Sequence, residues 1–131
     1  MPSPKRVPET ESLFTRCLAL SRQAEAAGSY EAAYHALMAT LHLADLNHSL
    51  DQLNQVTELA HEQEQRLEAL DPPHALSKAA STQRGTTAVY QSFQVHAEAV
   101  SARLKAHAAR DHVGHHLGLE GQNESEEGRE P

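Results

Sequence analysis

The segment 32–44 contains no Asp, Glu, Lys or Arg, and this feature restricts the fold more than any other. Its only strongly polar residues are His35, Thr40 and His42. At helical spacing, apolar side chains then lie on nearly every face of the segment. A helix of that kind is normally surrounded by protein. We therefore expect it to be the central element of the fold, or to present one face to another subunit.

The flanking segments also repeat apolar residues at helical spacing, and none alternates as a strand would. The pattern predicts helices over about 9–27, 30–47, 49–70 and 74–110. Short connections between them favour antiparallel neighbours. The predicted fold is an all-α, antiparallel bundle of four to five helices with disordered N- and C-terminal tails.

Glycines and prolines divide the predicted helices. Gly28 is placed to end the first helix in a left-handed conformation. The sequence Asp71-Pro72-Pro73 ends the third, since the second proline excludes helical backbone at the residue before it. Gly85 predicts a break within 74–110, giving a short helix and then a longer one. One unbroken helix that overhangs the bundle is the alternative.

Two sets of residues form the predicted core of the first two helices. In the first helix the set is Leu13, Cys17, Leu20, Ala24 and Ala27, widened by Phe14 and Leu18. In the second it is Ala33, Tyr34, Leu37, Leu41 and Ala44. Both sets recur at spacings of three and four residues, which place them on one helix face.

The ends of the chain differ from the bundle in composition. Residues 1–8 hold three prolines and predict a disordered arm. Residues 111–131 hold four glycines and predict a flexible acidic tail. Within that tail, 118–131 carries five glutamates against Arg129 alone, which is more than half of the net charge of −7. The helical domain is therefore expected to be 9–110.

Charge and composition exclude several classes of protein. The body of the chain is nearly balanced in charge and has few aromatic residues, which argues against nucleic-acid binding. No uncharged stretch is long enough to cross a membrane, and the N-terminus has no apolar signal region. One cysteine, Cys17, allows no intrachain disulfide. We expect a cytoplasmic protein that binds neither membranes nor nucleic acid.

Residues 17–45 resemble a single tetratricopeptide (TPR) helical hairpin. Leu20, Gly28, Tyr30, Ala33 and Leu37 stand where that family places its apolar, glycine, tyrosine and small residues. The resemblance implies binding of a peptide or protein on a concave helical surface. The same pattern also suits any tight turn between two helices, and no second copy follows along the chain.

Ten histidines are the oddest feature of the composition. If the helices pack in chain order, their turns bring Arg22, His35, His61 and Arg84 to one level of the bundle. Arginines bind carboxylate or phosphate through two parallel hydrogen bonds, and histidines donate hydrogen bonds or move protons. These four residues are the candidate ligand-binding site. The alternative is that all four are ordinary polar residues of a structural bundle.

Two shorter motifs suggest other chemistry. Glu58 and His61 have the Glu-x-x-His spacing of bundle metal sites, but the chain offers no second such pair. Arg110 and His115 match the Arg-polar-x-x-x-His motif of HEPN-type RNases, which that resemblance would make catalytic. We assign no metal site, no cofactor and no catalytic residue from these motifs.

The sequence therefore favours a non-enzymatic helical module for protein–protein interaction, with either another protein or a second copy of this chain as the partner. A small bundle that binds an anion or a metal through the Arg22, His35, His61 and Arg84 layer is the first alternative. An RNase of the HEPN type is the second.

Overall fold

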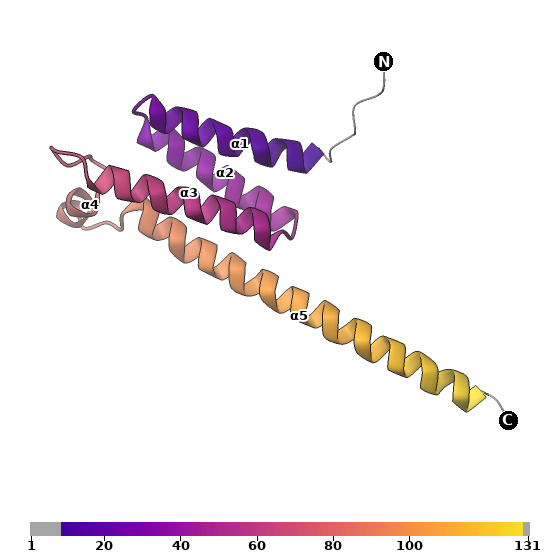
Figure 1. Cartoon of the computed structure of the whole chain (residues 1–131). Helices are drawn as coiled ribbons and strands as arrows, with labels where there is room; N and C mark the ends of the chain where they lie inside the picture. Colours follow the sequence, from indigo (N-terminus) through magenta and orange to yellow (C-terminus); the bar gives the residue numbers. More distant parts are fainter. Residues whose placement is uncertain (1–8, 130–131) are drawn as a thin grey trace, which may run out of the picture.

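The computed structural model describes the backbone of residues 9–129 and the side chains of residues 13–111. Five α-helices and no strands occur in this part of the chain, which confirms the predicted all-α bundle (Figure 1). Their bounds are α1 Glu9–Ala26, α2 Tyr30–Leu46, α3 Leu50–Glu68, α4 Lys78–Arg84 and α5 Val89–Arg129. The predicted arm, 1–8, lies outside the described residues.

Helices α1, α2, α3 and α5 run in alternating directions, and the short α4 lies at the end of the bundle where α3 finishes (Figure 1). Helix α2 contacts α1, α3 and α5. Helix α3 in turn contacts α1, α2 and α5. The uncharged segment therefore belongs to one of two central helices, as its composition predicts.

Residues with left-handed backbone lie at the ends of three helices. Gly28 follows α1 with φ +82°, His48 follows α2 with φ +51°, and Gly85 caps α4 with φ +72°. The break at Gly85 makes 74–110 two helical units, so the single unbroken helix is excluded. At the start of α3, the Ser49 hydroxyl accepts a hydrogen bond from the Gln52 backbone N–H at 3.1 Å, which is the bond typical of an N-cap serine.

The core lies between the four long helices. Its largest fully buried side chains are Tyr90, Phe93, Leu37, Leu41, Leu53, Leu67, Gln63, Val56, Val100, Thr40 and Ser21. Every buried apolar residue of α5 in this core lies between Tyr90 and Leu104. The bundle is therefore closed by the first half of α5.

The predicted core face of α1 is partly wrong. Leu13 and Leu20 are 37% and 55% exposed, whereas Phe14 and Leu18 are buried and Ser21 is inaccessible to solvent. The Ser21 hydroxyl donates a hydrogen bond to the Ala33 carbonyl at 2.8 Å. Phe14, Leu18 and Ser21 therefore share the inward side of α1, and the neighbouring side with Leu13 and Leu20 faces outward.

Helix α5 continues well past the end of the bundle (Figure 1). Its 41 residues give a length of about 60 Å. The backbone of 111–129 is helical, where the sequence predicts a flexible tail. Side chains after Asp111 lie outside the described residues, and flexibility of this segment stays a prediction. No described helix combines the length and the apolar character needed to span a bilayer.

Candidate interaction surface

A buried chain of hydrogen bonds joins four helices, beginning with the bond from the Ser21 hydroxyl of α1 to the Ala33 carbonyl of α2. The Gln63 amide nitrogen lies 2.9 Å from the Ser21 hydroxyl oxygen, and the Tyr90 hydroxyl donates to the Gln63 amide oxygen at 2.7 Å. Burial raises the pKa of the Tyr90 hydroxyl, and the carboxylate of Glu25 raises it further. No buried side-chain polar atom in the described part of the chain lacks a partner. The layer is therefore a satisfied internal contact between α1, α2, α3 and α5.

Further polar contacts hold α3 to its neighbours. The Arg66 guanidinium donates to both carboxylate oxygens of Glu25 in α1, at 2.5 and 2.7 Å. On the other side of α3, the Gln94 amide of α5 donates to the buried Glu64 at 3.0 Å. Charge-assisted and paired bonds of this kind fix the relative positions of helices. Helix α3 is thus fixed on both flanks.

The structure does not bring the predicted ligand-binding residues together. Arg22 lies beside Glu58 and Glu62 where α1 meets α3, and His61 lines a separate groove between α3 and α5. His35 lies on the outer side of α2, with its ring against Tyr34. Arg84 is at the end of α4, 3.4 Å from the Ser81 hydroxyl. All four of the predicted residues are exposed.

The reason for this error is rotation about the helix axes more than register along them. Ser21 and Gln63 occupy the layer in which the sequence places Arg22 and His61, one and two positions away. One position turns a side chain by about 100° around a helix, enough to exchange an outward for an inward direction. The helix that supplies the last residue of the layer also differs from the prediction. Tyr90 of α5 occupies the position that the sequence analysis gives to Arg84 of the short α4.

A surface groove of about 320 Å³ lies between α3 and α5. Its polar lining consists of Asn54, Thr57, His61, Gln94, Glu98 and Ser101. Among residues 13–111, no group of three or more His, Cys, Asp or Glu side chains is arranged to hold a metal ion. The Glu58 and His61 pair therefore gains no further ligand from α5.

The outward side of α2 forms an exposed and uncharged stripe. Its residues are Ala32, His35, Ala39, His42 and Leu46, all exposed and spaced by three or four positions. The outward side of α3, the other central helix, instead carries Gln55, Glu58 and Gln65. The expectation that protein encloses 32–44 is thus met on three flanks of α2 within one chain, but not on this fourth flank.

A second stripe of the same spacing lies on α5. Its residues are Ser92, Val95, Ala99, Ala102 and Ala106, again all exposed. The two stripes adjoin because the His42 ring lies 5.6 Å from the His96 ring and Arg103 forms an ion pair of 2.5 Å with Asp45. We call these ten residues the uncharged face.

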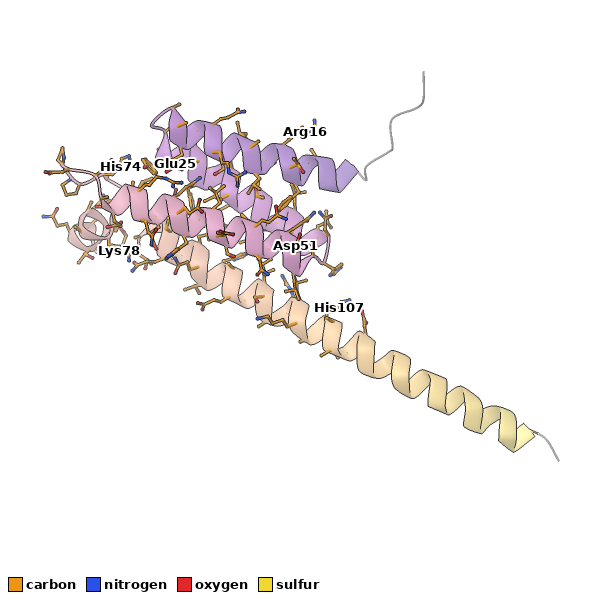
Figure 2. All side chains as sticks on the ribbon, viewed as in Figure 1. Arg16, Glu25, Asp51, His74, Lys78 and His107 are labelled. Carbon is orange, nitrogen blue, oxygen red and sulfur yellow. The ribbon has the colours of Figure 1, made fainter. Side chains whose placement is uncertain are left out.

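Four histidines outside the predicted ligand-binding set form two ring contacts, which join α2 and the turn after it to α5. His42 meets His96 edge to face, and His48 stacks on His107 with ring centroids 5.1 Å apart. His107, labelled on α5 in Figure 2, also lies 3.2 Å from the carboxylate of Asp111. Finding these pairs from the sequence would have required knowing that α2 and α5 run side by side in the same direction.

The structure describes the side chain of only one of the two residues of the RNase motif. Arg110 is exposed on α5. The side chain of His115 lies outside the described residues. The catalytic role that the RNase resemblance implies for these two residues therefore stays untested.

Comparison of the chain with protein-family models, with curated proteins and with solved structures gives no match. The hairpin of α1 and α2 exists as predicted, but kinship with TPR proteins remains a resemblance carried by a few residues. The candidate site thus depends on the geometry of this chain alone.

Proposed function

We propose that this chain is a non-enzymatic protein–protein interaction module and that the uncharged face is its binding surface. The main support for this proposal is the difference between the exposed side chains of the two central helices, α2 and α3. Both expose one flank, but α3 exposes amides and carboxylates whereas α2 exposes alanine, leucine and histidine. A contiguous apolar surface on a small protein is typical of a site that another protein covers.

The composition of the uncharged face suits a helical partner. Leu46 and Val95 are the most exposed large apolar residues of the structure described, at 64% and 68%. Ala39 and Ala99 belong to the same face and present only a methyl group, which allows another helix to approach closely. Spacing by three and four residues is the pattern through which helices pack along their length.

The proposal also places the protein in the cytoplasm. Cys17 is the lone cysteine and is free. A reducing compartment keeps such a thiol unoxidised.

The test compares a substitution on the uncharged face with the same substitution elsewhere. Ala39→Glu puts a carboxylate in the middle of the uncharged face, and Ala79→Glu puts one on the exposed side of α4. Each tagged full-length chain is used to recover bound protein from a lysate of the source cells, with helix content checked by circular dichroism. Burial of an unpaired charge in an interface opposes binding.

We expect the wild type and Ala79→Glu to recover the same bound protein, which is either another protein or untagged copies of this chain. Ala39→Glu should not recover it. Loss of that protein with Ala39→Glu alone supports the proposal. Equal recovery with Ala39→Glu, Ala79→Glu and the wild type would show that the interaction uses another surface and would contradict it.

A further inference from the structure

We propose that the occupant of the uncharged face is a second copy of this chain, packed antiparallel about a twofold axis near Met38 and Ala39. The inference rests on the proposed function and adds the identity of the partner. Each copy would contribute α2 and α5, so that four helices form the interface. Residues of the face would then contact the same face of the other copy, as in most homodimers.

The charges at the two ends of the face select this arrangement. Glu31 is exposed at the start of α2, and Arg103 lies beside Asp45 at its other end. An axis perpendicular to α2 brings Glu31 of one copy to the level of Arg103 of the other, and does so twice. A parallel arrangement would instead place Glu31 beside Glu31, which costs free energy.

The same axis matches the remaining residues of α2. It puts His35 of one copy opposite His42 of the other, and it leaves the small Ala39 close to the axis. Neutral imidazoles are acceptable in an interface because each can donate and accept one hydrogen bond. The centre of the contact is therefore small and uncharged, and the ion pairs lie at its rim.

The surface area that the face can bury sets the affinity that we expect for the dimer. Helix α2 has 17 residues and is about 25 Å long. Two adjacent helices, each about 10 Å wide, offer about 500 Å² per copy. Both copies together then bury about 1,000 Å², the lower limit for specific interfaces. We expect a reversible dimer with a dissociation constant on the order of micromolar.

The first experiment measures mass by sedimentation equilibrium of the purified full-length chain over a range of concentrations. We expect the 14.3 kDa chain to approach twice that mass at about 100 µM. Ala39→Glu and Ala99→Glu are each expected to weaken the dimer by about a hundredfold or more, since Ala39→Glu buries carboxylates near the axis and Ala99→Glu buries one on either side of it. Ala79→Glu is the matched control and should dimerise as the wild type does.

The second experiment tests the antiparallel arrangement through charge reversal. Glu31→Arg puts two positive charges at each end of the dimer, and Arg103→Glu puts two negative charges there. Each variant alone should be mostly monomeric where the wild type is dimeric. An equimolar mixture should restore the dimer, because a mixed dimer regains opposite charges at both ends. Circular dichroism checks that Arg103→Glu, which loses its Asp45 partner, still folds.

Three results would overturn the inference. A wild-type chain that stays monomeric at about 100 µM has no such dimer. A dimer that survives both Ala39→Glu and Ala99→Glu uses another surface. A mixture of the charge variants that stays monomeric excludes the antiparallel arrangement. If the wild type is monomeric but Ala39→Glu still abolishes recovery of another protein from the lysate, the proposed function stands and only the self-association fails.

Discussion

At the scale of single residues, the internal contacts depend on three neutral polar side chains. Gln63 uses its amide nitrogen toward Ser21 and its amide oxygen toward Tyr90, so both ends of one side chain are engaged in the core. A buried polar group costs free energy if its partner is removed, and much less if both partners are present. These residues therefore specify which faces of α1, α3 and α5 meet.

Tyr90 gives a prediction about alkaline pH. Its pKa is raised in the folded chain, first by burial and then by Glu25; the pKa of Tyr30 is raised as well, again mainly by burial. A tyrosine whose pKa is higher in the folded chain than in the unfolded chain contributes its full stabilisation below the unfolded pKa of about 10. That stabilisation is lost as the pH rises above this value. We expect the free energy of unfolding in urea to be level from pH 7 to 9 and to fall above pH 10.

Tyr90→Phe tests the cause of that fall. At pH 7 the variant should be less stable by about 1–3 kcal/mol, because the Gln63 amide oxygen loses its donor. Above pH 10 its stability should fall less steeply than that of the wild type. Tyr34→Phe, at a half-buried tyrosine, is the control. A decline as steep in Tyr90→Phe as in the wild type would show that another group causes it.

At the scale of elements, the ends of the helices are set by backbone conformation. Gly28 and Gly85 both have positive φ, and a methyl group added at either would meet no atom within 4 Å. The requirement for glycine there is thus one of backbone conformation and not of space. A residue with a Cβ is strained in the left-handed region, and asparagine is strained less than alanine.

Substitution of each glycine should separate these effects. Gly28→Ala and Gly85→Ala are each expected to lower the free energy of unfolding by about 1 kcal/mol, measured in urea at pH 7. Gly28→Asn and Gly85→Asn should cost less than the alanine variants. Equal losses for alanine and asparagine at both sites would contradict a conformational origin.

At the scale of the whole molecule, the bundle and the extension of α5 are distinct parts of the structure. The buried core runs from Phe14 to Leu104, and the described contacts from α5 back to the bundle end with His107. Helix α5 nevertheless continues to Arg129 (Figure 1). The stability of the bundle should then come from the chain before residue 112.

Truncation tests this division. A chain that ends at Asp111 should keep its free energy of unfolding to within about 0.5 kcal/mol, since no core residue is lost. A chain that ends at Ala99 loses the buried Val100 and Leu104 and the Arg103 ion pair. It should be destabilised by several kcal/mol, on the order of 2–5 for each large core residue removed. Similar losses from both truncations would place part of the stabilising contact beyond Asp111.

The sequence by itself determined the helices as far as about residue 110, the antiparallel packing of neighbours, and the ends at Gly28 and Gly85. It also determined that the segment 32–44 of one central helix lacks charge. These features depend on local backbone preference and on apolar spacing, which neighbouring residues encode directly.

Only the tertiary structure decided which side of each helix faces inward. The buried layer took Ser21 and Gln63 in place of Arg22 and His61, and α5 replaced α4 as its fourth member. A small rotation about a helix axis exchanges such neighbours, and its value is fixed by the fit of distant apolar surfaces and by the pairing of every buried polar group. Both conditions join residues far apart in the chain, so local patterns do not contain them.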